Sequence, residues 1–178
     1  MLARKPLDIP PHPPICDYNR TALDSNPLHT FWESYLATLP LDERDKKLPP
    51  AWAFGDGPEM ADRLGVLVCD GIKTATASLL WEYEYDRQLV PQPGDLNIIL
   101  DGARRPLCII ETVRVDIRPF DRVDADFASQ EGEGDLSLES WRDAHWRFFS
   151  RACMAIHRVS TTKMPVVCEH FQVVFRRN

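Results

Sequence analysis

The sequence lacks the features of membrane and secreted proteins. No apolar run approaches the roughly 18 residues that a membrane-spanning helix needs. The N-terminus has no basic segment followed by an apolar one, which is the pattern of a secretion signal. The five cysteines are odd in number and scattered, which argues against a disulfide framework. We therefore expect a cytoplasmic protein with free thiols and no membrane partner.

Positive charge is also scarce. The chain has 21 lysines and arginines against 27 acids, and its net charge is −6 at pH 7. A domain that holds long nucleic acid by its phosphates is usually basic. The balance is uneven, however, because residues 121–143 are strongly acidic and residues 144–178 are mainly basic. The total charge disfavours a general polynucleotide binder, while the C-terminal part leaves a local basic surface open.

Zinc-binding and repeat patterns are missing as well. The pairs Cys153 and His157, and Cys168 and His170, have spacings that match no common structural zinc site. No segment repeats, and the length and composition suit a single globular domain. We predict no metal and no cofactor.

Prolines crowd the beginning of the chain, where residues 1–26 hold five of the fifteen. Because proline fixes φ and lacks a backbone donor, this segment is predicted to be an extended arm. The arm could lie over the domain or over a neighbouring subunit, and in the second case it would support a homodimer. The folded domain is predicted to span residues 27–178.

Three helices are predicted from apolar spacing and end signals. The first follows the N-cap Asn26 and stops at Pro40. The second begins near Pro58 and ends at Gly71, because glycine reaches the left-handed conformation that often terminates a helix. The third runs over about 137–156.

Strand patterns dominate the rest of the chain. Turn residues and alternating or continuous apolar runs place the strands at 74–80, 96–100, 107–117 and 165–175. The strands and helices do not alternate regularly, which favours an α+β fold. The strands are predicted to be mixed and to curl into a small β-barrel with flanking helices.

Reactive residue types gather in the stretch Gly71–Ser78, which holds Lys73, Thr74, Thr76 and Ser78. The glycine would turn the chain out of the second helix and direct these side chains into the first strand. Each residue also has an ordinary structural interpretation. A lysine at the start of a strand is commonly an exposed charge, and threonine and serine are common in strands.

The motif Gly71-x-Lys73-Thr74-x-Thr76 after a short helix resembles the signature of the ASCH domain, a member of the PUA-like β-barrel group. The resemblance covers roughly residues 28–175. Further segments resemble a longer bacterial subgroup of the family: Phe54-Gly55-Asp56, Ala75–Leu79, Pro93-Gly94-Asp95, residues 131–135, Trp141-Arg142-x-x-His145 and Val167-Cys168-Glu169.

The resemblance implies a link to RNA or to nucleosides. Some family members are suspected to bind RNA, and one bacterial relative is reported as a ribonuclease. Another is an amidohydrolase that removes the acetyl group from N4-acetylcytidine. Carried over by motif position, Lys73 would be the base, Thr76 the nucleophile and Glu131 the acid of such a hydrolase. A non-catalytic module that binds single-stranded RNA and a ribonuclease are the alternatives.

These catalytic roles set physical requirements. A lysine base needs a pKa lowered from about 10.4 toward 7, and a carboxyl acid needs a raised pKa. Repulsion from Glu133 would favour a raised pKa at Glu131. Lys73 and Thr76 point to opposite faces in a regular strand, so the backbone must be irregular over 72–74.

Other residues are predicted to contact the substrate rather than to react. Thr74, Ser78 and Glu133 belong to this group. Arg142 could bind a phosphate or a carbonyl group, or it could pair with the acidic loop of residues 131–135. His145 is predicted to be a core histidine bonded to a carbonyl and not a catalyst.

Overall fold

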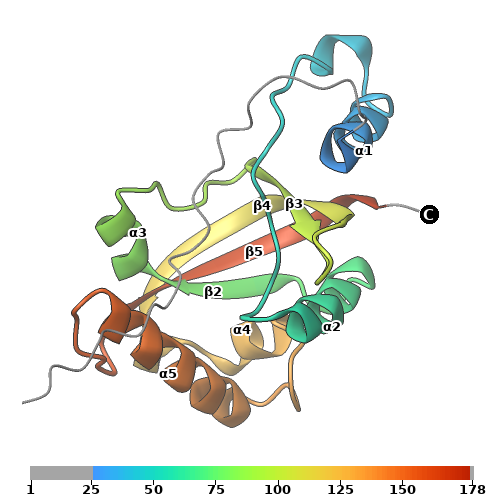
Figure 1. Ribbon diagram of the computed structural model, residues 1–178. Helices are drawn as coiled ribbons and strands as arrows, with labels where there is room; N and C mark the ends of the chain where they lie inside the picture. Colours follow the sequence, from blue (N-terminus) through green and yellow to red (C-terminus); the bar gives the residue numbers. More distant parts are fainter. Residues whose placement is uncertain (1–25, 177–178) are drawn as a thin grey trace, which may run out of the picture.

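The computed structural model describes residues 26–176, in which one five-stranded sheet has helices on both sides (Figure 1). The predicted proline-rich arm lies outside the described residues, except for Asn26. The helices are α1 (Pro27–Leu36), α2 (Pro58–Cys69), α3 (Leu80–Asp86), α4 (Ala125–Gln130) and α5 (Leu138–Ala155). The strands are β1 (Ala51–Trp52), β2 (Ala75–Leu79), β3 (Leu96–Leu100), β4 (Pro106–Pro119) and β5 (Pro165–Arg176).

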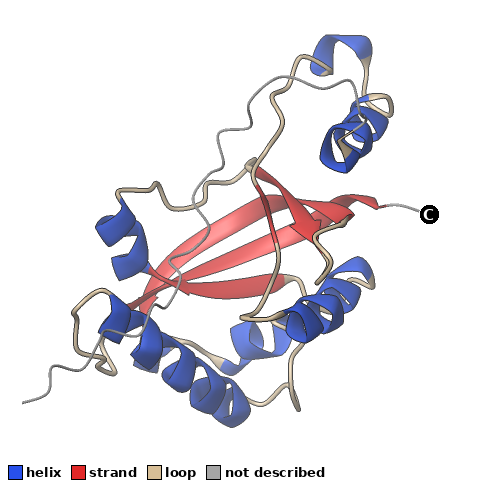
Figure 2. Cartoon of the chain, in the orientation of Figure 1, coloured by secondary structure: helices blue, strands red, loops and turns tan. Residues whose placement is uncertain are grey.

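The sheet is mixed and has the strand order β1-β3-β4-β5-β2. The short strand β1 pairs with β3 in parallel, and the other pairs are antiparallel. Figure 2 shows the strands in the centre of the molecule with helices around them. The predicted α+β class with mixed strands is confirmed. The described strands form an open sheet with β1 and β2 as its edges, and not the closed barrel that was expected. Register shifts between β4 and β5 bend the sheet, as β-bulges do.

The two faces of the sheet carry different packing partners. Alternate β5 residues Val166 and Cys168 join β2, α4 and α5 in one buried cluster. Phe171 points to the opposite face and packs with α2. The helix α1 packs a third cluster near the far end of the sheet, through Phe31 and Trp32. Each fully buried apolar side chain of this size contributes about 1.5–3 kcal/mol.

The predicted end of α2 at Gly71 is confirmed. This residue has φ +71°, and its N–H donates to the carbonyl of Val68 at 3.0 Å. The next residue, Ile72, donates to the carbonyl of Leu67 at 2.9 Å, which completes a Schellman turn. The strand β2 starts only at Ala75, so the backbone over 72–74 is irregular, as the predicted site requires.

Two short helices were absent from the sequence-based prediction. The strand predicted over 74–80 ends at Leu79, and α3 begins at the next residue. The helix α4 has six residues, and its N-cap Asp124 accepts a hydrogen bond from the Phe127 N–H at 2.9 Å. Segments this short contain fewer than two helical turns, so apolar periodicity cannot reveal them.

Two further observations concern the helices and the cysteines of the described chain. No helix in residues 26–176 has the length and apolar character needed to cross a membrane. The thiols of Cys69, Cys108, Cys153 and Cys168 are free. Cys16 lies outside the described residues.

Candidate functional site

The Lys73 side chain is buried at the irregular entry to β2. Its side chain is 1% exposed, and Nζ donates to Glu131 Oε2 at 2.8 Å and to Glu133 Oε1 at 2.6 Å. A third, longer hydrogen bond of 3.3 Å goes to the Glu131 carbonyl. The three donors of the ammonium group are therefore all directed to the acidic loop. The loop of residues 131–135 therefore faces the lysine.

The other carboxyl oxygen of Glu131 is held by α5. Trp141 Nε1 donates to Glu131 Oε1 at 2.8 Å, and His145 Nε2 lies 3.3 Å from the same oxygen. The imidazole Nδ1 lies 3.0 Å from the Trp141 carbonyl, which agrees with the prediction of a carbonyl partner for His145. Glu131 is therefore fixed by one cation, one indole and one imidazole.

The two charges of this pair stabilise each other. Burial alone would lower the pKa of Lys73, but the carboxylates of Glu131 and Glu133 outweigh burial and raise it. Burial alone would raise the pKa of Glu131, but Lys73 and His145 outweigh it and hold that pKa well below the ordinary value. In this state the lysine keeps its proton and Glu131 is ionised. These protonation states are opposite to those that the predicted base and acid need.

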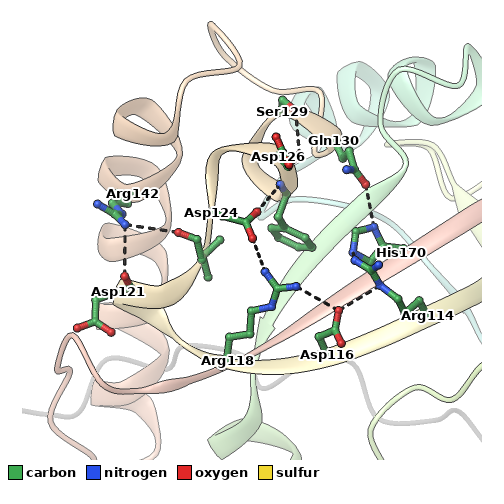
Figure 3. A network of polar contacts seen from close by, with 12 residues as sticks. Arg114, Asp116, Arg118, Asp121, Asp124, Asp126, Ser129, Gln130, Arg142 and His170 are labelled. Carbon is green, nitrogen blue, oxygen red and sulfur yellow. Dashed lines mark hydrogen bonds and ion pairs between the residues drawn. The ribbon is translucent and has the colours of Figure 1, made fainter.

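A polar network joins α4 to β4 and β5 and so fixes the position of Glu131 (Figure 3). Arg118 Nη1 donates to Asp124, the N-cap of α4, at 2.6 Å. At the other end of the helix, Gln130 Oε1 lies 2.9 Å from His170 Nδ1. The Gln130 carbonyl accepts a hydrogen bond of 2.8 Å from the Thr74 N–H. The acidic loop is thus tied directly to the segment that carries Lys73.

His170 is the centre of this network (Figure 3). Its Nε2 lies 2.7 Å from Arg114 Nη2, and its ring packs edge-on against Phe127 with centroids 5.3 Å apart. Burial, together with the charge of Arg114, lowers the pKa of His170. A neutral imidazole is the form that can accept from arginine through one nitrogen and donate to Gln130 through the other.

A glycine permits the close approach of the acidic loop to the lysine segment. Gly132 has φ +70°, and a Cβ at this position would lie 2.8 Å from the Ile72 carbonyl oxygen. Any larger residue would therefore meet both a disfavoured backbone conformation and a steric clash. The sequence Glu131-Gly132-Glu133 places two carboxylates around one ammonium group because the residue between them has no side chain.

The threonine and serine of β2 lie apart from this ion pair. Ala75 and Leu79 belong to the cluster under α5, so Thr76 and Ser78 point to the other face of the sheet. Ser78 Oγ lies 3.0 Å from Tyr83 Oη, and Thr76 pairs with Glu169 of β5. No hydrogen bond joins the lysine to either hydroxyl in the described chain.

Arg142 is also separate from the lysine. Its Nη2 donates to the carbonyls of Asp121 and Val123, each at 3.4 Å. These contacts join α5 to the segment before α4 (Figure 3). The structure therefore gives this arginine an internal partner and does not bring it to the other predicted substrate contacts. Thr74 remains close to the site, with its Oγ1 3.4 Å from the Gln130 carbonyl.

Aromatic rings and a pocket lie beside the lysine. Nζ is 5.3 Å from the centroid of the Phe54 ring, and that ring is 6.0 Å from the ring of Phe171. A pocket of about 300 Å³ opens at the end of α2, and its lining includes Gly71, Lys73, Thr74 and Phe171. In residues 26–176 no group of three or more histidine, cysteine or acidic side chains could hold a metal ion.

Comparison with known proteins gives a family match and two similar solved structures. The sequence pattern of the ASCH domain matches residues 50–175. A protein from Enterococcus faecalis V583 is 38% identical over 84% of this chain and 89% of its own, with a TM-score of 0.77. The ASCH domain from Lactobacillus crispatus JV V101 is 34% identical over 84% of this chain and 95% of its own, with a TM-score of 0.79. A search among curated proteins found no match.

Proposed function

Because this chain belongs to the ASCH domain family, we propose that it is a hydrolase that cleaves an amide on a modified nucleoside such as N4-acetylcytidine. The observation that carries the proposal is the buried Lys73 ammonium, held between Glu131 and Glu133 at the family motif. Buried charges with strongly shifted pKa values are concentrated at catalytic sites. The pocket beside Lys73 supports access for a small ligand.

Charge favours a nucleoside over a polynucleotide. One ammonium and two carboxylates give the site a net negative charge, and the Glu133 side chain is 35% exposed. The whole chain also carries a net charge of −6. Phosphate contacts supply most of the non-specific affinity for nucleic acids, and they need a positive surface. A nucleoside has no phosphate, so its binding does not require a positive surface.

The protonation states assign different roles from those expected for a lysine base. Lys73 carries its proton, so in this proposal it stabilises the negative charge that develops on the amide oxygen in the transition state. Glu131 orients the ammonium group, and Thr76 supplies the attacking hydroxyl. The Thr76 oxygen bonds to the acetyl carbon as the C–N bond breaks, and the hydroxyl proton passes to the leaving amine. Water then adds to the resulting ester, and cleavage of the bond to the Thr76 oxygen releases acetate and restores the hydroxyl.

Turnover of N4-acetylcytidine to cytidine tests the proposal. We expect the wild-type protein to release cytidine and Lys73→Arg to lose at least about 100-fold in kcat/KM, because a planar guanidinium cannot reproduce the position of the ammonium group. Lys47→Arg, at an exposed position, is the matched control and should keep full activity. Full activity of Lys73→Ala would show that the lysine assignment is wrong.

The same protein should be offered short single-stranded RNAs. Release of shorter RNA fragments, without deacetylation, would replace the proposal with a ribonuclease. Binding of RNA that weakens steeply with salt, again without turnover of either substrate, would replace it with a binding module.

A further inference from the structure

A second buried acid, Glu169, lies in β5 without a cationic partner. The residue is 5% exposed, and its Oε1 accepts a hydrogen bond from Thr112 Oγ1. None of the ion pairs in residues 26–176 includes this carboxyl. Because burial of an unpaired carboxylate costs several kcal/mol, a buried acid in neutral surroundings is stable mainly in its protonated form.

Hydroxyl groups from three elements surround this acid. Thr76 of β2 is its direct partner in the strand register, and Thr112 belongs to β4. Ser78 lies two residues further along β2 and contacts Tyr83 of α3 at 3.0 Å. The phenol is close enough to Glu169 for the carboxylate charge to contribute, after burial, to a raised pKa of Tyr83. The hydrogen-bonding groups placed around Glu169 in the described chain are therefore hydroxyls and not cations.

The other oxygen of the acid is unpartnered. No donor within the described part of the chain forms a hydrogen bond with Glu169 Oε2. Burial raises the pKa of Glu169, the hydrogen bond from Thr112 opposes this effect, and the negative charge of Asp95 adds to it. When Oε2 is protonated, it has one hydrogen to donate.

We propose that the Glu169 carboxyl recognises the base of the substrate by donating a hydrogen bond from Oε2 to a ring nitrogen or carbonyl oxygen. This inference rests on the proposed function for the identity of the ligand, because a cytosine ring presents both kinds of acceptor. Thr76 is the register partner of Glu169, and the Ser78 and Tyr83 hydroxyls, which contact each other, offer further hydrogen bonds to a neutral base.

The same arrangement connects Glu169 to the lysine site. Phe171 is two residues further along β5, so its side chain lies on the same face as Glu169. Its ring contacts Phe54, which in turn lies under the Lys73 ammonium. A base held by Glu169 would therefore occupy the face of the sheet that carries the motif threonine Thr76.

Binding of cytidine, a product that cannot be deacetylated, tests the inference by calorimetry. Affinity of the wild-type protein should fall at least about tenfold, or about 1.4 kcal/mol, as pH rises through the raised pKa of Glu169. Besides Glu169, the titratable groups facing this site are Tyr83 on α3 and Asp95 in the turn before β3.

Substitutions of Glu169 test the role of its carboxyl group separately from the residues around it. Glu169→Gln keeps a neutral donor, so its affinity should stay within about threefold of the low-pH wild-type value and be independent of pH. Glu169→Ala should lose at least about tenfold. Glu111→Gln, at an acid of the same sheet that contacts Gln172, is the control and should keep the wild-type pH profile. Thermal unfolding of each variant checks that the fold is intact.

The outcomes separate this inference from the proposed function. Turnover of N4-acetylcytidine with unchanged affinity in Glu169→Ala would overturn the inference alone. Affinity that rises with pH and disappears in Glu169→Gln would also overturn it, because the carboxyl would then act as an ionised acceptor. Binding of cytidine with the expected pH profile, but without any deacetylation, would overturn the proposed hydrolase and leave the inference standing.

Discussion

Glu131 and Glu169 are both almost completely buried, yet they have opposite surroundings. Glu131 lies 2.8 Å from a lysine ammonium and accepts a hydrogen bond from an indole. Glu169 contacts a threonine hydroxyl and forms no ion pair within residues 26–176. The pKa is lowered at the first carboxyl and raised at the second. Burial alone therefore does not determine whether an acid is ionised. The groups that contact the buried carboxyl determine it.

Removal of the cation gives the strongest test of this comparison. Lys73→Met should lower the free energy of unfolding by about 3–5 kcal/mol, because it leaves Glu131 buried without its counter-charge. The double variant Lys73→Met with Glu131→Gln should recover much of this loss. Urea denaturation measures both, with Lys47→Met as an exposed control. A loss below about 1 kcal/mol in the single variant would contradict the ion-pair description.

The pH dependence of stability should separate the two acids. The pKa of Glu131 falls to about 2 in the folded protein, from about 4.3 unfolded, so its stabilisation is present above the unfolded value. This contribution, about 3 kcal/mol, should be lost as pH falls toward 2. Glu131→Gln should therefore flatten the acid side of a plot of unfolding free energy against pH.

Glu169 should behave in the opposite way. Its folded pKa is raised, so the stabilisation is present below the unfolded pKa and is lost as pH rises through the folded one. Glu169→Gln should remove this loss and leave the acid side unchanged. An identical effect of the two substitutions on the curve would show that the surroundings of the carboxyls do not differ.

Gly132, which lies between the two carboxylates of the loop, and Gly71 provide a matched pair of alanine substitutions. Gly132→Ala should cost about 2 kcal/mol or more, because its Cβ would meet the Ile72 carbonyl as well as a positive φ. Gly71→Ala has nearly the same φ but open space around the new Cβ, so about 1 kcal/mol is expected. Denaturation measures the free energy of unfolding of both variants. Equal losses would mean that the close approach of the loop to the segment carrying Lys73 does not contribute to stability.

The smallest effect is expected at the partner of the second acid. Thr112→Val removes the hydroxyl that donates to Glu169, at a cost of about 1 kcal/mol. Because this hydrogen bond favours the ionised carboxyl, its loss should raise the pKa of Glu169 further. The pH at which cytidine affinity falls should move upward in the variant. A downward shift would contradict the assignment.

The sequence allowed much of the scaffold to be predicted. The end of α2 at Gly71 and the irregular backbone before Ala75 follow from residue types alone, because glycine has a distinct backbone preference. The meeting of Lys73 with Glu131 was expected only from the family motif, since 58 residues separate them. Short helices such as α3 left no periodic signal.

The charge states could not be predicted in the same way. The role of a base required a lowered pKa for Lys73, but the structure adds two carboxylates that raise it. Glu169 stands within the buried run of β5, which was an available signal for an unusual acid. Its neutral partners depend on strand register and on the position of α3, and neither is visible in local sequence.

Glu133 has a further consequence for how tightly a ligand can bind. Its carboxylate occupies one donor of Lys73 at 2.6 Å while its side chain stays 35% exposed. A ligand oxygen that binds the ammonium group must therefore displace the Glu133 carboxylate. Because this carboxylate is tethered to the site by the chain, its effective concentration there is on the order of millimolar or higher. The apparent affinity is therefore the intrinsic affinity multiplied by the fraction of time in which this carboxylate is away from Lys73. Shortening the arm, as in Glu133→Asp, would weaken the competitor without removing its charge.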